Sequence, residues 1–323
     1  MPKVSVIIPV YGVERYIEKC VRSLLGQTLA DMEFIFVDDC TKDKSILVLE
    51  RVLEDYPYRK SQVKIIHNEK NLGLPLTRRK GLSVATGDYI AHCDSDDWVD
   101  TSLYESMYNK AVSEQSDIVV CDFITLWRGK RTLRKSIHNT DLKKYTCNLL
   151  SQIDSLSVCN KLYKRQLYDN DIKFPVFNMG EDMATTLQII KYCKRVSYVT
   201  DVYYYYNGES NSISREETKS ATIKRANEAC ANARLVIDAY KTECSKEVKR
   251  AMICLKFNQR RLYMPAINYS DVYMLWKNSF PEINFHVLFN PFVRIQLVDR
   301  IKFGMTWLGF FPWIKQHFRQ NLV

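Results

Sequence analysis

The 323-residue sequence lacks the short motifs that identify many nucleotide- and metal-binding proteins. It contains neither GxGxxG nor GxxxxGK[ST], which excludes the common dinucleotide-binding and P-loop sites. Its ten cysteines include no CxxC pair. We therefore expect buried thiols in a reducing compartment, and neither a zinc site nor a disulfide framework. The histidines have no metal-ligand spacing and are expected to be structural: His67, His92, His138, His286 and His317.

The opening stretch does not resemble a signal peptide, and the sequence has no long apolar run. Lys3 is followed directly by a strand pattern without a small-residue cleavage site, so no signal peptide is expected. The apolar segment 303–314 has about 12 residues and contains Pro312, whereas a membrane-spanning helix needs about 20. These absences predict a cytoplasmic protein that reaches a membrane only from its surface.

The net charge of +10 is unevenly distributed. Residues 1–215 hold 30 Lys and Arg against 28 Asp and Glu, whereas residues 216–323 hold 17 against 9. A basic tail beside a nearly neutral body indicates an acidic partner surface, either phospholipid or nucleic acid. The alternative is a basic helix face that is simply solvated.

Apolar strand patterns alternate with amphipathic helix patterns in the first hundred residues. This order is typical of a doubly wound, mostly parallel α/β sheet. Strands are expected at 4–10, 34–37, 63–66 and 89–93, and helices at 13–25, 43–56 and 74–85. Beyond residue 100 we expect a helix at 102–113, a strand at 118–121, an irregular polar segment at 125–160, a helix within 178–194, a strand at 195–206 and basic helices from 216 to about 262.

Polar residues follow three of the predicted strands, at Pro9-Val10-Tyr11, Asp38-Asp39 and Asp94-Ser95-Asp96-Asp97. The carboxyl ends of parallel strands meet at one crevice, where α/β sheets bind ligands. Neighbouring carboxylates repel and raise one another's pKa, so a cation is expected among them. Hard oxygen ligands suit Mg²⁺ or Mn²⁺. The alternative is a polar turn in which Asp97 caps a helix.

Seven segments in order resemble the family 2 glycosyltransferases, which are inverting enzymes with the nucleotide-diphospho-sugar transferase (GT-A) fold. They are VSVIIPVY (4–11), VDDCTKD (37–43), NLGLPLTRRKGL (71–82), CDSDDW (93–98), CNKLYKRQLY (159–168), GED (180–182) and YYYYNGESNSISR (203–215). Three residues depart from the family pattern. Cys40 replaces a glycine, Arg79 stands where Asn is usual and leaves Arg78 as the matching arginine, and Tyr206 stands where relatives often carry Arg.

The resemblance implies the residues that bind the donor nucleotide and its metal. Asp38 would contact the base or ribose, Asp94 a ribose hydroxyl, and Asp96 the Mn²⁺ or Mg²⁺ that bridges the diphosphate. Asp39 could instead bond its own loop, and Arg78 could be solvated rather than paired with the donor. The full donor-binding set is Pro9, Val10, Tyr11, Asp38, Asp39, Arg78, Asp94, Ser95 and Asp96.

Asp182 of the GED segment matches the family's catalytic base. Inverting transfer needs a carboxylate on the acceptor side to take the proton of the attacking hydroxyl. Glu181 is the competing residue, and a helix cap without chemistry is a further alternative. Lys161 is expected to orient phosphate or acceptor, or else to form a structural salt bridge.

Three parts are expected: a nucleotide-sugar-binding half (1–100), an acceptor-binding half (101–215) and a basic helical extension (216–323). The tail could lie in an anionic membrane interface or cover the back of the catalytic domain. Its expected lipid contacts are Trp307, Phe310, Phe311, Trp313, Arg294, Arg300, Lys302, Lys315 and Arg319.

The resemblance implies a metal-dependent enzyme of the hexosyltransferase type. It would move a sugar from a nucleotide-diphosphate donor, expected to be a UDP-sugar, to a glycan or lipid-linked saccharide in cell-surface polysaccharide synthesis. No nucleic-acid partner is expected. One alternative is a nucleotidyltransferase, which is disfavoured because no glycine-rich loop follows the first strand. The other is a nucleotide- or nucleic-acid-binding protein without transferase activity, but this alternative leaves the acidic crevice unexplained.

Overall fold

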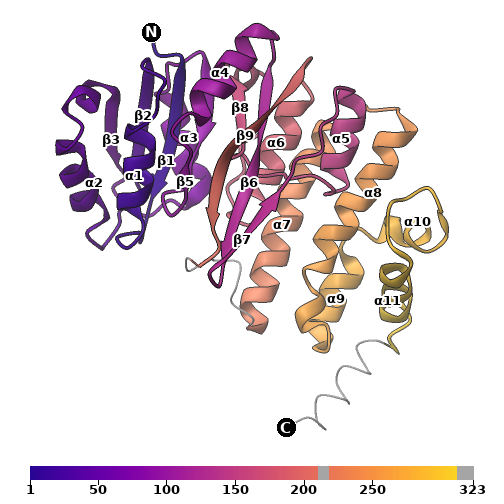
Figure 1. Ribbon diagram of the computed structural model, residues 1–323. Helices are drawn as coiled ribbons and strands as arrows, with labels where there is room; N and C mark the ends of the chain where they lie inside the picture. The colour runs from indigo at the N-terminus through magenta and orange to yellow at the C-terminus, as the bar shows by residue number, and fades with distance from the viewer. Residues whose placement is uncertain (210–217, 311–323) are drawn as a thin grey trace. The chain divides into compact units, whose positions relative to one another are not determined.

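The computed structural model describes residues 1–209 and 218–310, which form two compact units (Figure 1). The first unit holds residues 1–142, 157–176 and 188–209. The second holds residues 143–156, 177–187 and 218–310.

The first unit is built on a sheet whose first half is parallel. Its strands are β1 (Val4–Val10), β2 (Met32–Asp38), β3 (Val63–His67) and β4 (Tyr89–His92), in the order β3-β2-β1-β4. The seven residues of β1 are all buried, as expected for an apolar strand inside a parallel sheet. Its end is in register with the end of β2, because Val10 lies opposite Asp38. The carboxyl ends of β1 and β2 therefore lie side by side.

Helices connect these parallel strands: α1 (Ile17–Leu25), α2 (Ser45–Glu54) and α3 (Leu74–Ser83), with the short 3₁₀ helix η1 at Pro57–Gln62. α1 and α2 pack against each other (Figure 1). α3 packs closely on β1 and β2 because it has a glycine at the contact. A Cβ atom added to Gly81 would lie 2.6 Å from Cγ2 of Ile7, so no larger residue fits there without movement.

The second half of the sheet is mixed, with the order β4-β8-β6-β9-β5 and β7 paired to β6. Six of the nine strands in the described residues run in one direction, while β5, β7 and β8 are antiparallel to their partners. The remaining elements of this part are β5 (Trp98–Val99), α4 (Leu103–Ser113), β6 (Ile118–Trp127), β7 (Lys130–Arg134), β8 (Lys161–Lys164), η2 (Arg165–Asp169) and β9 (Val196–Asn207). Helix α6 (Glu181–Ile190) begins in the second unit and ends in the first. This arrangement confirms the expected α/β fold with a mostly parallel sheet.

The irregular structure predicted for 125–160 is wrong. This segment contains β7 and helix α5 (Leu142–Leu150). All five residues of β7 are exposed, so the strand carries no apolar alternation. α5 buries polar residues beside its leucines, so its sequence does not show the spacing of apolar residues that predicts an amphipathic helix.

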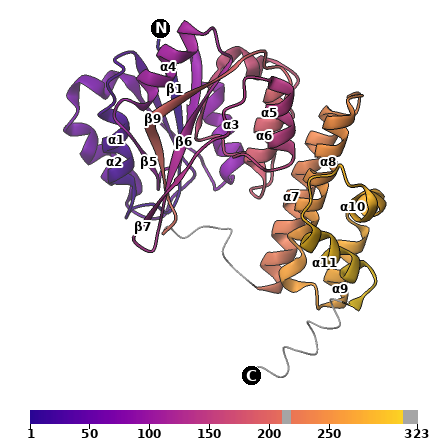
Figure 2. The same cartoon turned by 45° about the vertical axis from the view of Figure 1, so that its right-hand side comes forward.

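The second unit is helical beyond residue 218, as expected for the extension (Figure 2). α7 and α8 are its two longest helices and pack against each other. Within the described residues, none of the helices combines the length and the apolar character needed to cross a bilayer. The elements are α7 (Lys219–Ala239), α8 (Lys246–Arg261), η4 (Met264–Ala266), α9 (Ser270–Asn278), η5 (Pro281–Ile283), α10 (Asn284–Phe289) and α11 (Leu297–Trp307).

Arg300 of α11 has a structural role that differs from the expected lipid contact. Its guanidinium donates to the backbone carbonyls of Val287, Asn290, Val293 and Ile295 at 2.6–3.1 Å. These bonds tie the loop between α10 and α11 to α11 itself. Among the other expected contacts, Trp307 and Phe310 are exposed, whereas Phe311, Trp313, Lys315 and Arg319 lie outside the described residues.

Candidate functional site

The polar segments that follow β1, β2 and β4 lie at one edge of the sheet in the first unit. β1 is the central strand of the three, since it pairs with β2 on one side and β4 on the other. Pro9 and Val10 are buried at its end, and Tyr11 is 51% exposed just beyond it. The structure therefore brings together the three strand ends that the sequence singled out.

The loop after β2 holds Asp38 in place through a left-handed turn. Cys40 has a φ of 60°, a conformation that glycine adopts more easily than other residues. The turn lets the N–H of Thr41 donate to Oδ1 of Asp38 at 2.8 Å. Nδ1 of the exposed His67 lies 2.9 Å from Oδ2 of the same carboxylate. Each carboxylate oxygen can accept a second hydrogen bond, so Asp38 can still bind a ligand hydroxyl or amine.

The loops after β1 and β2 are joined by hydrogen bonds. The N–H of Gly12 donates to Oγ1 of Thr41 at 2.9 Å, and the N–H of Glu14 donates to Oδ2 of Asp43 at 2.9 Å. Burial alone would raise the pKa of Asp43, but hydrogen bonds from Ser45, from the N–H of Glu14 and from Thr41 hold the pKa below its ordinary value. A charged Asp43 thus fixes the rim of the crevice.

Asp39 is buried, and both of its carboxylate oxygens bind the loop that opens α3. Oδ1 accepts from Nδ2 of Asn68 and from the N–H of Leu72, both at 2.8 Å. Oδ2 accepts from the N–H of Gly73 at 2.9 Å. The loop-bonding alternative therefore describes the contacts of Asp39, although the partner is the loop 68–73 and not its own.

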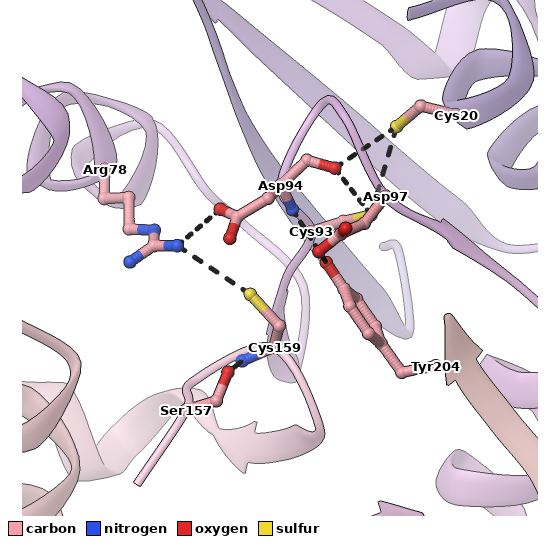
Figure 3. A network of polar contacts seen from close by, with 8 residues as sticks. All are labelled: Cys20, Arg78, Cys93, Asp94, Asp97, Ser157, Cys159 and Tyr204. Atoms are coloured by element: carbon pink, nitrogen blue, oxygen red, sulfur yellow. Dashed lines mark hydrogen bonds and ion pairs between the residues drawn. The ribbon is translucent and has the colours of Figure 1, made fainter. Parts of the chain in front are cut away.

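Arg78 of α3 reaches the acidic turn after β4 (Figure 3). Its Nη2 donates to Oδ1 of Asp94 at 2.5 Å and lies 3.7 Å from Sγ of Cys159. Arg78 is 5% exposed, so the solvated alternative does not describe it. A buried guanidinium beside a carboxylate places a fixed cation at the edge of the crevice.

Asp97 is buried beneath this turn and does not cap a helix, contrary to the alternative considered from the sequence. It is followed by the short strand β5, and α4 begins only at Leu103. Tyr204 of β9 donates its hydroxyl to Oδ2 of Asp97 at 2.6 Å, and the N–H of Asn207 donates to Oδ1 at 2.6 Å. The Tyr204 oxygen also accepts the N–H of Asp94 at 3.1 Å (Figure 3). β9 thereby fixes the backbone of the acidic turn.

Negative charge is concentrated in this turn. Burial, and then the neighbouring Asp96 and Asp94 carboxylates, raise the pKa of Asp97 well above its ordinary value. Asp94 and Asp96 are half-buried, whereas Ser95 is buried. Among residues 1–209 and 218–310, no group of three or more His, Cys, Asp or Glu side chains is arranged to hold a metal ion by itself.

This donor set fits Mg²⁺ or Mn²⁺ held jointly with a phosphorylated ligand. Mg²⁺ is usually bound through one or two carboxylates, with waters and substrate phosphates completing its coordination. Half-buried Asp96 and Asp94 can supply that number of hard oxygen atoms. After burial, the carboxylates of Asp96 and Asp94 raise the pKa of Asp97, and a divalent cation would offset the charge of these two carboxylates.

The Tyr-rich strand β9 has four different tyrosine environments. Tyr204 is buried under the acidic turn, and Tyr205 stacks on Trp98 with ring centroids 5.5 Å apart. Tyr206 is exposed, and Tyr203 is half-buried. Residues 210–215 of the segment YYYYNGESNSISR lie outside the described residues.

Glu181 and Asp182 occupy the first turn of α6 and belong to the second unit. Glu181 is 5% exposed, whereas Asp182 is half-buried. Gly180 precedes them with a φ of 78°, a left-handed turn that starts the helix abruptly. Acidic residues at a helix N-terminus are favourable with the helix dipole, so the capping alternative stays open for Glu181.

Lys161 lies in the first unit and is 1% exposed. Its ammonium donates to the carbonyl oxygen of Ser157 at 2.7 Å and to Oδ1 of Asn160 at 2.8 Å. These contacts fix the segment before β8.

Sequence reasoning missed the residues that hold the site from a distance, namely His67, Cys159, Tyr204 and Asn207. Each acts on a residue at least 29 positions away in the chain. The sequence offers no local signal for such pairs. The run of four tyrosines indicated a strand, but it did not identify which ring points inward.

The chain is similar in sequence to known glycosyltransferases. The model of "Glycosyl transferase family 2" matches residues 5–171. An uncharacterized glycosyltransferase, EpsJ of Bacillus subtilis, is 32% identical over 235 residues, which cover 68% of this chain and 65% of that protein. A poly(ribitol-phosphate) beta-glucosyltransferase of Bacillus spizizenii is 31% identical over 224 residues, covering 65% of this chain and 34% of that protein. The chain thus spans less than two thirds of these relatives.

Two solved structures have the same fold. The crystal structure of S. aureus TarS 1–349 in complex with UDP-GlcNAc matches with a TM-score of 0.61 and 19% identity, over 99% of this chain and 92% of that chain. The mannosyltransferase PcManGT of Pyrobaculum calidifontis, in complex with GDP-Man and Mn²⁺, matches with a TM-score of 0.55 and 16% identity, over 98% of this chain and 87% of that chain.

Proposed function

The chain belongs to glycosyl transferase family 2, and we propose that it is an inverting glycosyltransferase whose donor is a nucleotide-diphosphate sugar. The observation that carries this proposal is the group of polar side chains at the carboxyl ends of β1, β2 and β4. There Asp38 ends β2, the half-buried Asp94 and Asp96 follow β4, and the buried Arg78 of α3 forms an ion pair with Asp94. A nucleotide sugar needs these three elements: acceptors for base and ribose groups, a cation near phosphate, and a hard metal ligand.

In this proposal the end of β1 and the two acidic strand ends bind the nucleotide. Asp38 accepts hydrogen bonds from the base or ribose, and Asp94 accepts one from a ribose hydroxyl. Exposed Tyr11, with Pro9 and Val10 behind it, borders the base. Asp39 supports the site without contacting the nucleotide, because its carboxylate binds the loop 68–73. Ser95 lies in the turn that carries the metal ligand.

Asp96 would hold Mn²⁺ or Mg²⁺ together with the phosphate oxygens of the donor. When bound, the ion stabilises the negative charge that grows on the leaving diphosphate. Arg78 adds a fixed positive charge beside Asp94 and keeps that carboxylate in one orientation. The TarS structure holds UDP-GlcNAc, and the PcManGT structure holds GDP-Man and Mn²⁺. Both support this class of ligand by analogy.

Asp182 is the proposed catalytic base. It accepts the proton of an acceptor hydroxyl while the hydroxyl oxygen attacks the anomeric carbon from the face opposite the leaving diphosphate, which inverts the configuration. Of the two acids at the start of α6, Asp182 is the more accessible, because Glu181 is buried. Glu181 then supports the first turn of the helix.

The acceptor in this proposal is a glycan or lipid-linked saccharide of a cell-surface polymer. The relative named as a poly(ribitol-phosphate) beta-glucosyltransferase supports a polymer of this kind. Residues 1–100 bind the donor, 101–215 bind the acceptor, and 216–323 form the extension. The enzyme acts in the cytoplasm, and the extension meets the anionic inner surface of the membrane.

Exposed apolar side chains on the last two described helices support the membrane contact. Phe285 and Phe289 of α10 are each 67% exposed, and Leu297 of α11 is 71% exposed. Arg294 and Lys302 are exposed among them. Aromatic and aliphatic side chains interspersed with basic residues are typical of surfaces that lie in an anionic interface.

Calorimetry with a panel of nucleotide sugars tests the proposal. Titrations of UDP-glucose, UDP-galactose, UDP-GlcNAc and GDP-mannose with Mn²⁺ should give binding of at least one UDP-sugar, and EDTA should abolish it. If no nucleotide sugar binds, and the protein binds RNA with an affinity that is lost at modest salt, the nucleic-acid alternative is favoured.

A further inference from the structure

The second unit contains a cavity of about 400 Å³ that no step of the transferase reaction uses. Pockets for small ligands typically measure about 300–1,000 Å³. α8, η4, α9 and α11 contribute its lining, which is mainly apolar. Its apolar residues are Phe257, Met264, Pro265, Trp276 and Phe303.

A fully buried cation, Arg260, lies in the wall of this cavity. Its guanidinium stacks on the ring of Trp276, 3.8 Å from the centroid, and lies 4.9 Å from that of Phe303. Its Nε donates to the carbonyl of Trp276 at 2.6 Å, its Nη1 to Oδ1 of Asn284 at 2.5 Å, and its Nη2 to the carbonyl of Lys277 at 3.3 Å. Across the part of the chain that the structure describes, no carboxylate lies within ion-pair distance of it.

The charge of Arg260 is therefore buried without an anion. Burial lowers the pKa of Arg260 to about 10, so the group is still charged at neutral pH. The nearby Glu282 is already paired with Lys256 at 2.7 Å. A buried charge is costly unless it is paired, which makes an anion a favourable occupant of the space beside it.

The exposed part of the lining is also basic. Lys302 and Arg261 are exposed there, and Lys302 forms no ion pair with a described residue. Asp299 is the acid in the lining, and its Oδ2 lies 3.5 Å from Nη1 of Arg261. Lys302 can thus meet a ligand directly, whereas the fully buried Arg260 adds its positive charge from within the wall.

We propose that this cavity binds an anionic amphiphile, a molecule with one apolar chain and a single carboxylate or phosphate head. The chain lies along the apolar part of the lining, and the head meets Lys302 in the positive field of the buried Arg260. A neutral apolar ligand would leave the buried cation without an anion, and a free phosphate ion would leave the aromatic walls in contact with water. The proposal does not depend on the transferase activity.

The surroundings of the cavity favour a lipid as the natural source of such a molecule. α11 contributes Lys302 and Phe303 to the lining, while its residues Leu297, Val298 and Ile301 are 71%, 57% and 54% exposed. The same helix therefore borders the cavity and offers an apolar face. If this apolar face lies on a membrane surface, an amphiphile that leaves the membrane there would enter the cavity beside Lys302.

Calorimetry on the full chain tests the proposal with four probes. Decyl phosphate and decanoate, used below their micelle concentrations, supply a chain with an anionic head. Decyl maltoside supplies a chain with a neutral head, and inorganic phosphate supplies the anion alone. We expect both anionic chains to bind roughly tenfold more tightly than either of the other two probes, because decyl maltoside lacks the charged hydrogen bond and inorganic phosphate lacks the apolar contact.

Two substitutions localise the binding. Lys302→Ala should weaken decyl phosphate by roughly five- to tenfold, and Met264→Trp should abolish binding by filling the space. Lys249→Ala on the exposed part of α8 removes the same charge outside the cavity and should change nothing. The proposal is overturned if decyl maltoside or inorganic phosphate binds as tightly as decyl phosphate. It is also overturned if Lys302→Ala keeps the melting temperature of the wild type and binds decyl phosphate equally well.

Discussion

The left-handed turn at Cys40 makes a quantitative prediction about stability. A left-handed backbone costs an L-residue with a Cβ roughly 1–2 kcal/mol, and Cys40 adopts it with a φ of 60°. Glycine avoids that cost but loses more conformational freedom on folding, worth about 0.5–1 kcal/mol. Cys40→Gly should therefore stabilise the protein by a net amount of about 0.5–1 kcal/mol. The melting temperature should rise by roughly 1–3 °C.

The assay is thermal unfolding followed by fluorescence, with two matched variants. Cys40→Ala retains the backbone cost and should melt close to the wild type. Cys244→Gly lies at an exposed position outside the residues with positive φ, so it should lower stability by about 0.5–1 kcal/mol. If Cys40→Gly destabilises as Cys244→Gly does, the chain at residue 40 is not left-handed, and the account of how Thr41 reaches Asp38 fails.

Three other predictions concern catalysis, the ion pair and the membrane. Asp182→Asn should lower turnover by roughly 10²–10⁴-fold with donor affinity unchanged, and Glu181→Gln should be milder; the reverse order in turnover assays would identify Glu181 as the base. Arg78→Met should lower the free energy of unfolding by about 1.5–3 kcal/mol in denaturant titrations, because a charged hydrogen bond to Asp94 is lost; an unchanged midpoint would exclude that bond. Full-length protein should bind anionic vesicles at low salt. Glu substitutions at two exposed α11 positions, 297 and 301, should abolish this binding. If the wild-type protein does not bind such vesicles, the membrane contact is refuted.

The strands and helices of the first hundred residues could be predicted because their signals are local. VSVIIPV is apolar at every position except Ser5 and became the fully buried β1. The helix predicted at 74–85 became α3 at Leu74–Ser83, between the left-handed Gly73 and Val84. In both cases the pattern lies within the element itself, so it reports the burial of that element whichever part of the chain covers it.

The support of the site could not be predicted, because it comes from distant parts of the chain. Asp97 resembles a helix cap in sequence, yet it is buried by Tyr204 and Asn207, which lie more than 100 residues later. Arg300 resembles a lipid contact in sequence, but it satisfies carbonyls of the preceding loop. A charged residue in a sequence does not reveal which buried polar groups it must satisfy.

Metal-dependent donor binding by Asp96 tests the central claim most directly. Calorimetry should show UDP binding to the wild type that requires Mn²⁺. Asp96→Ala should weaken that binding by roughly 10–100-fold or more with an unchanged melting temperature, because Asp96 is only half-buried. Asp88→Ala, which removes an exposed acid just before β4, should bind UDP as the wild type does. Equal Mn²⁺-dependent affinity for UDP in the wild type and in Asp96→Ala would contradict the account.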